Sequence, residues 1–118
     1  MKLLTQAQRK QLLANGRAQR EAIRSGMDDI TPLDPKLFTP DGGATWLLTE
    51  LDPEDPTLAF GLCDLGIGFP ELGYVSLAEL AEVRGRLGLS VERDQSFQAD
   101  QPISTYLAEA LRHGRIRA

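Results

Sequence analysis

The sequence has little of what most metal and nucleophilic sites need. It contains one cysteine, Cys63, and one histidine, His113, in 118 residues. A single cysteine cannot form a disulfide within the chain, and the two residues are too few for a zinc site of histidine and cysteine ligands. Any metal would have to be a hard cation such as Mg²⁺ or Ca²⁺ on carboxylates, and otherwise we expect no cofactor. This cysteine usage suits a reducing cytosol, so we expect a cytoplasmic protein.

Long apolar runs and phosphate-binding loops are also missing. No stretch approaches the roughly 18 apolar residues that span a bilayer, and the opening "MKLLTQAQRK" lacks the apolar region of a signal peptide. We therefore expect no membrane partner. No GK[ST] triplet occurs, and in the pattern that begins at Gly66 a glutamate, Glu71, replaces the third glycine of a dinucleotide loop. These glycines are more typical of a turn between two strands.

Charge is present but segregated along the chain. Residues 1–26 hold six Lys and Arg against one acid, whereas residues 27–82 hold one Lys against twelve acids. The remainder holds six Arg against four acids, and the net charge is −4. A basic end followed by an acidic middle indicates two different surfaces. Mutual neutralisation within one fold explains the same layout, and both interpretations stay open.

The N-terminal segment has helix signals. Thr5 and Gln8 form a capping box, and Asn15–Gly16 is typical of a helix end. A second basic helical stretch should then run to Gly26. Neither stretch has a wide apolar stripe, so we expect both to pack weakly. Residues 27–35, with two prolines, predict a loop.

The middle of the chain has strand signals. A hairpin centred on Glu54 would place Leu48 opposite Phe60 and Trp46 opposite Leu62, with all four side chains on one face. The expected strands are 36–39, 44–51, 57–64 and 72–75.

Helix signals return after the last of these strands. Ser76 and Glu79 form a capping box for a helix that should end near Gly88, and "LSVERD" predicts a short edge strand. Apolar residues spaced by three and four predict an amphipathic helix near the C-terminus. The chain is therefore expected to be one α+β domain, a small antiparallel meander with helices packed on one face. Its parts are a basic helical segment 1–26, a sheet plus central helix 36–94, and a C-terminal helix 100–114.

Three carboxylates are expected at one rim of this sheet. The hairpin brings Asp64 near Asp41 in the "PDGG" turn, and Glu71 returns on the following loop. Such a group could hold Mg²⁺ or Ca²⁺, or do general acid–base work in a hydrolase or nuclease. Aspartates also cap turns without any ligand, and that alternative stays open.

Two charged surfaces are candidate binding sites. Acidic residues on a rigid sheet could steer a basic protein partner, with Phe69 as an exposed anchor. The candidate partner-binding residues are Glu50, Asp52, Glu54, Asp55, Asp64, Phe69 and Glu71. The basic N-terminus could contact nucleic-acid phosphates, or it could be a solvated helix face. The candidate phosphate contacts are Arg9, Lys10, Arg17, Arg20 and Arg24.

Residues 36–80, "KLFTPDGGATWLLTELDPEDPTLAFGLCDLGIGFPELGYVSLAEL", carry a family resemblance, together with "LLANGRAQRE" and "VERDQSF…PISTY". The chain resembles small bacterial proteins that are grouped as a domain of unknown function and are often encoded on conjugative plasmids and integrative elements. The resemblance implies an accessory role, such as transfer support or countering host defence, and supplies no catalytic residue.

The leading interpretation is a non-catalytic accessory protein of mobile genetic elements that binds a protein through its acidic surface. An anti-restriction or anti-CRISPR-type inhibitor of a nucleic-acid-binding defence complex is its most specific form. The alternatives are a divalent-metal-dependent hydrolase or nuclease, and a DNA-binding accessory protein that uses the basic N-terminus.

Overall fold

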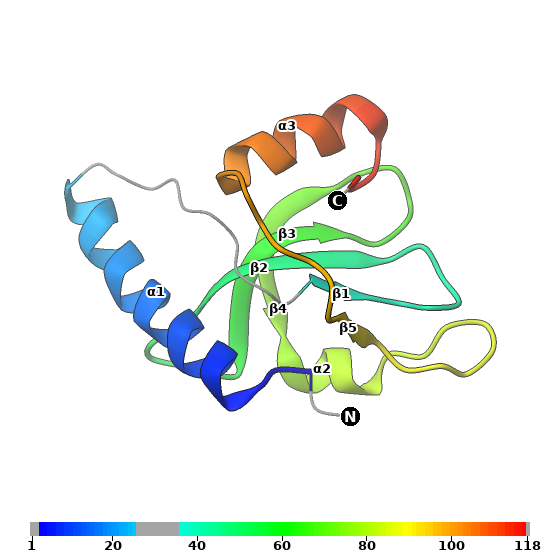
Figure 1. Ribbon diagram of the computed structural model, residues 1–118, viewed down its shortest axis with the longest axis horizontal. Coiled ribbons are helices and arrows are strands. Elements are labelled where there is room, and N and C mark those ends of the chain that lie inside the picture. Colours follow the sequence, from blue (N-terminus) through cyan, green and yellow to red (C-terminus); the bar gives the residue numbers. More distant parts are fainter. Residues whose placement is uncertain (1–2, 26–35, 118) are drawn as a thin grey trace.

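The structure is a computed structural model that describes residues 3–25 and 36–117, with only the backbone described for 19–25. Within these ranges the chain folds into a five-stranded antiparallel sheet with three helices, as expected for an α+β protein (Figure 1). The strands are β1 (Lys36–Phe38), β2 (Thr45–Leu51), β3 (Leu58–Asp64), β4 (Glu71–Ser76) and β5 (Glu92–Asp94). The helices are α1 (Gln6–Ser25), α2 (Leu77–Glu82) and α3 (Ile103–His113).

The strand order is β4-β3-β2-β1-β5, so β4 and β5 are the edges. The expected edge strand in "LSVERD" is confirmed as β5, and α3 is confirmed with a left-handed C-cap at Gly114. The loop expected at 27–35 lies outside the described residues. In the ranges that the structure describes, no helix is long and apolar enough to cross a bilayer.

The hairpin of β2 and β3 has a different register from the expected one. Trp46 lies opposite Cys63 and not opposite Leu62. The register shifts again between Leu48 and Glu50, where the strand bulges. Because side chains alternate along a strand, a one-residue slip moves every side chain of one strand to the other face relative to its partner. The predicted shared face of β2 and β3 is therefore wrong.

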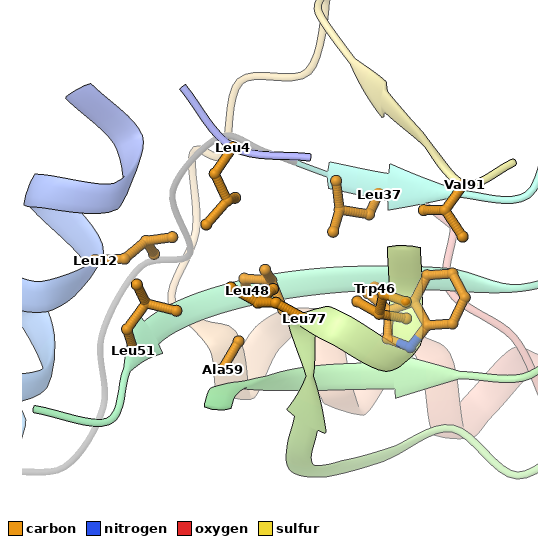
Figure 2. Packing of buried hydrophobic residues seen from close by; sticks show 10 residues of the cluster. Leu4, Leu12, Leu37, Trp46, Leu48, Leu51, Ala59, Leu77 and Val91 are labelled. Atoms are coloured by element: carbon orange, nitrogen blue, oxygen red, sulfur yellow. The ribbon is translucent and has the colours of Figure 1, made fainter. Parts of the chain in front are cut away.

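One face of the sheet packs against α1 and α2. Figure 2 shows this cluster, which gathers apolar side chains from both helices, from β1, β2 and β3, and from the segment before β5. Its buried members are Leu4, Leu12, Leu37, Trp46, Leu48, Leu51, Ala59, Leu77, Leu80 and Val91. The N-terminal helix is thus part of the core, contrary to the weak packing that its sequence suggests.

The opposite face packs against α3. Leu47 and Leu62 form a second cluster there with Phe97, Ile103 and Ala110. Leu47 alternates with Trp46 along β2, which places the two clusters on opposite sides of the sheet. Helices therefore cover both faces, and the expected packing on one face is corrected. The cause is that β2 and β3 carry apolar residues at successive positions, and the alternation of side chains along a strand turns these residues toward both sides.

The predicted helix end at Asn15–Gly16 is also wrong, since α1 runs through it. A Cβ on Gly16 would lie 2.0 Å from the carbonyl oxygen of Leu51, and the Asn15 side chain donates to the Thr49 carbonyl at 3.0 Å. The pair lets the helix approach β2 closely. The capping boxes, by contrast, are confirmed at Thr5 with Gln8, and the Ser76 hydroxyl accepts the Glu79 N–H.

Candidate functional site

Three loops meet at one end of the sheet. Residues 39–44 follow β1, residues 65–70 follow β3, and residues 83–91 lead into β5, so antiparallel pairing brings them together (right side of Figure 1). The chain after α3 reaches the same place, because Gly114 lies beside the carbonyl of Gly68. We call this region the loop end.

Asp64 joins two of the segments at the loop end. Its side chain is 2 % exposed. One carboxylate oxygen accepts the N–H of Gly66 at 2.8 Å, and the other accepts the N–H of Ile116 at 2.9 Å. The carboxylate therefore fixes the 65–70 loop and the C-terminal tail to the end of β3.

Asp41, in the loop after β1, fixes the segment of residues 83–91 in the same way. Its Oδ2 accepts the N–H groups of Leu87 and Leu89. A side chain on Gly85 would collide with this carboxylate, so the turn closes tightly over it. These contacts hold a turn where the sequence predicts helix to near Gly88. The helix α2 instead ends at Glu82.

The three carboxylates predicted to share a metal site lie at the same end but do not form one group. Glu71 is exposed at the start of β4, opposite Cys63 in the sheet. Asp41 and Asp64 each accept backbone hydrogen bonds from different segments. Among residues 3–25 and 36–117, no cluster of three or more Asp, Glu, His or Cys could hold a metal ion. Asp41 and Asp64 therefore act as anchors of the loops.

The loop that Asp64 anchors exposes apolar side chains. Leu65 is 61 %, Ile67 67 % and Phe69 76 % exposed, which confirms the expectation that Phe69 is exposed. Positive φ angles at Gly66 and Gly68 let the chain turn between them. The sequence signal for this surface was the alternation of large apolar residues with glycine inside a turn, where polar residues are usual.

A cavity of about 400 Å³ lies between this loop, β4 and α2. We call it the loop-end pocket. Trp46 and Cys63 contribute from the central strands, and Gly73 leaves open space, because a Cβ there would meet nothing within 4 Å. The other lining residues are Leu65, Ile67, Phe69, Glu71, Tyr74, Val75, Glu79, Leu80 and Val83. The lining is therefore apolar, with two carboxylates.

The thiol in this pocket is a packing group. Burial, and secondarily the charge of Glu71, raises the pKa of Cys63 from 9.0 to about 11. The sulfur also lies 3.8 Å from the Gly61 carbonyl oxygen and 4.0 Å from that of Gly73. Cys63 is therefore protonated at neutral pH, whereas a nucleophilic cysteine acts as the thiolate.

The acidic residues of the β2–β3 turn lie at the opposite end of the sheet. An oxygen of Asp52 accepts the N–H of Glu54 at 2.8 Å, and an oxygen of Asp55 accepts the N–H of Thr57 at 3.2 Å. With Glu50 at the end of β2, these side chains are separated from Phe69 by the length of the hairpin. The predicted partner-binding set is thus divided between two surfaces.

The basic residues of the N-terminus lie on α1. Arg9, Lys10 and Arg17 are exposed. Lys10 and Arg17 are seven residues apart, which places them on one side of the helix. The side chains of Arg20 and Arg24 lie outside the described residues.

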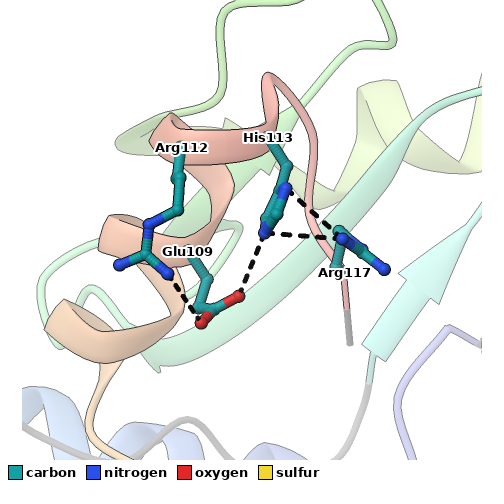
Figure 3. Close-up of polar contacts among 4 residues, drawn as sticks. All are labelled: Glu109, Arg112, His113 and Arg117. Atoms are coloured by element: carbon teal, nitrogen blue, oxygen red, sulfur yellow. Dashed lines mark hydrogen bonds and ion pairs between the residues drawn. The ribbon is translucent and has the colours of Figure 1, made fainter.

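A polar cluster holds the chain after α3. Figure 3 shows that the Glu109 carboxylate contacts both Arg112 and His113. The contact distances are 3.4 Å to Arg112 and 3.5 Å to His113. The guanidinium of Arg117 lies 3.3 and 3.4 Å from the two ring nitrogens of His113. With the bond from Ile116 to Asp64, these contacts fix the tail at the loop end.

Residues 3–117 match the family model described as "Protein of unknown function (DUF2958)". The chain belongs to the DUF2958 family. No curated protein and no solved structure matches it. The resemblance to a domain of unknown function is thereby confirmed over nearly the whole chain, and the family description assigns no activity to this DUF2958 chain.

Proposed function

We propose that this DUF2958 protein is a non-catalytic accessory protein that binds a protein partner at its loop end. The observation that carries the proposal is the exposure of Leu65, Ile67 and Phe69 around a cavity of about 400 Å³. Exposed apolar side chains that gather beside a pocket mark interaction sites. Asp64 anchors the loop that bears them, so little conformational entropy is lost when a partner binds.

The charges at the pocket indicate what kind of partner it takes. Glu71 and Glu79 line it, and its lining residues include no basic side chain. A partner segment with Lys or Arg beside a large apolar residue is therefore complementary. The acidic steering predicted from the sequence is kept, but it acts at the loop end and not at the turn around Glu54.

The most specific form of this function is inhibition of a host defence complex, of restriction or CRISPR type, by a protein of mobile elements. Such complexes carry basic nucleic-acid-binding surfaces, to which a protein of net charge −4 would be attracted. This form rests on the sequence resemblance and stays a prediction.

The test is selection of binders from a random peptide library displayed on phage. We expect the selected peptides to pair an aromatic or large aliphatic residue with Lys or Arg. Synthetic copies of the selected peptides should bind the Phe69→Ser variant at least about tenfold more weakly than they bind wild type, because burying a large apolar side chain contributes about 1.5–3 kcal/mol. Glu71→Lys should weaken binding through charge. Trp46, the only tryptophan, lines the pocket and reports occupancy by its fluorescence.

The matched control is Leu87→Ser. Leu87 is 80 % exposed on a neighbouring loop and does not line the pocket. Binding should be unchanged in this variant. A library that yields no binder, or peptides that bind wild type and Phe69→Ser equally, would contradict the proposal.

A second function, contact with nucleic acid, is favoured by the exposed basic side of α1. Lys10 and Arg17 lie on that side, and such side chains contact phosphates without reading bases. The described residues give no support to a hydrolase or nuclease that uses Asp41 and Asp64, because these aspartates hold backbone groups of separate loops.

A further inference from the structure

The two edges of the sheet are built differently. The edge strand β5 has three residues, all of them charged, and its Asp94 lies 3.7 Å from Lys36. The edge strand β4 has six residues, ELGYVS, and its single charge is at the first position. A sheet edge exposes backbone N–H and C=O groups that can pair with other chains, and short length and charged side chains protect the edge from such pairing. The β5 edge is protected in this way, and the β4 edge is not.

Side chains on both faces of β4 are also partly exposed. Leu72 is 39 % and Tyr74 61 % exposed, and Tyr74 packs edge-on against Phe60 with ring centroids 5.1 Å apart. On the other face, Gly73 and Val75 line the loop-end pocket. Among the described elements, only β3 pairs with β4. The unprotected edge therefore runs directly beside the apolar cavity.

We infer that the partner binds as an extended strand that pairs with β4 and extends the sheet. This inference rests on the proposed function and specifies how the partner segment lies. Backbone groups of alternate peptide residues would bond to β4, and alternate side chains would point to opposite faces. One set enters the loop-end pocket beside Gly73, and the other packs against Leu72 and Tyr74.

The pocket charges select a foreign basic strand over a second copy of this chain. A second copy would bring its own β4, with Glu71 again as its only charge, so it offers no cation to the glutamates of the first copy. Glu71 and Gly73 are two residues apart on the same face of β4. The peptide that fits best therefore has an apolar residue and, two positions away, a Lys or Arg.

The test is a scan of N-methylated backbone positions in the peptides selected from the phage library, measured against the full chain. N-methylation removes an N–H donor and blocks strand pairing at that residue. We expect losses of about tenfold or more at alternate positions and small effects between them, because only every second residue bonds to β4. Amide exchange in β4 should also slow when the peptide binds.

The outcomes separate the inference from the function on which it rests. In one outcome, the affinity losses in the N-methyl scan do not alternate along the peptide, but the peptides still bind the Phe69→Ser variant more weakly than wild type. This outcome overturns the strand inference and leaves the pocket function standing. A library that yields no binder overturns both. A dimer in sedimentation experiments without peptide, with slow exchange in β4, identifies a second copy as the occupant and overturns the choice of a foreign strand.

Discussion

At the scale of single residues, Asp64 shows that a carboxylate predicted as a metal ligand can have a structural role. Both of its oxygens accept backbone N–H groups, one of them from Ile116, 52 residues further along the chain. The sequence places Asp41, Asp64 and Glu71 at one rim correctly, because strand pairing alone sets which ends meet. It does not show which N–H groups the aspartates accept, because those groups come from distant segments.

Replacing Asp64 by alanine should therefore destabilise the whole domain. Two backbone N–H groups, those of Gly66 and Ile116, would lose their acceptor. Each such loss typically costs about 1–3 kcal/mol, so we expect a loss of about 2–6 kcal/mol in urea unfolding. The control is Asp55→Ala, which affects an exposed turn and should cost about 1 kcal/mol or less.

The same variant tests the alternative of a metal at Asp64. We expect Mg²⁺ or Ca²⁺ to leave the Tm of wild type unchanged. A rise in Tm with either cation that disappears in Asp64→Ala would instead indicate a metal site, since a ligand that binds the folded state stabilises it.

At the scale of elements, α1 and β2 approach each other closely because of one glycine. The residue before it, Asn15, adds a hydrogen bond to the Thr49 carbonyl where β2 bulges. The Asn15–Gly16 pair, which is typical of a helix end, therefore marks the place where α1 packs against β2. Local sequence cannot distinguish the two, because glycine both ends helices and permits close approach.

Gly16→Ala should be destabilising, although alanine normally stabilises a helix by about 1 kcal/mol relative to glycine. The new Cβ would lie 2.0 Å from the Leu51 carbonyl oxygen, so α1 must move away from β2. Overpacking of this kind costs about 1–3 kcal/mol, measurable by urea unfolding. The reverse change at an exposed position, Ala14→Gly, should cost about 1 kcal/mol by propensity alone. A gain in stability for Gly16→Ala would show that the helix does not pack there.

At the scale of the whole molecule, helices cover both faces of the sheet, and the chain divides its charges between surfaces. The basic helix is not an appendage, because Leu12 of α1 and Leu4, just before the helix, are buried in the larger cluster. Deleting it would expose the core, so a truncated chain cannot tell a loss of DNA contacts from a loss of folding.

Charge reversal at Lys10 and Arg17 tests the nucleic-acid function without this problem. Both side chains are exposed, so Lys10→Glu with Arg17→Glu should change stability by no more than about 1 kcal/mol. If α1 contacts phosphates, affinity for short duplex DNA should fall about tenfold or more at low salt, with a weaker salt dependence. Glu71→Lys serves as the control at the loop end. Equal affinity of the double variant and wild type would remove the second function.

The sequence by itself determined the kinds of elements and most of their places. Capping boxes at Thr5 and Ser76, the strands on each side of the turn at Glu54, and the C-terminal helix are local features, set by backbone hydrogen bonds and side-chain period. The same local signals led to the α+β class.

Only the tertiary structure decided which face each strand presents and what the loop end does. The bulge between Leu48 and Glu50 and the one-residue change of register redistribute the apolar side chains, because a period of two makes facing depend on a single residue. The bonds of Asp41 to residues 87 and 89, and of Asp64 to residue 116, then hold the loops in place. Contacts across such separations leave no local pattern, so the loop-end pocket exists only once the chain is folded.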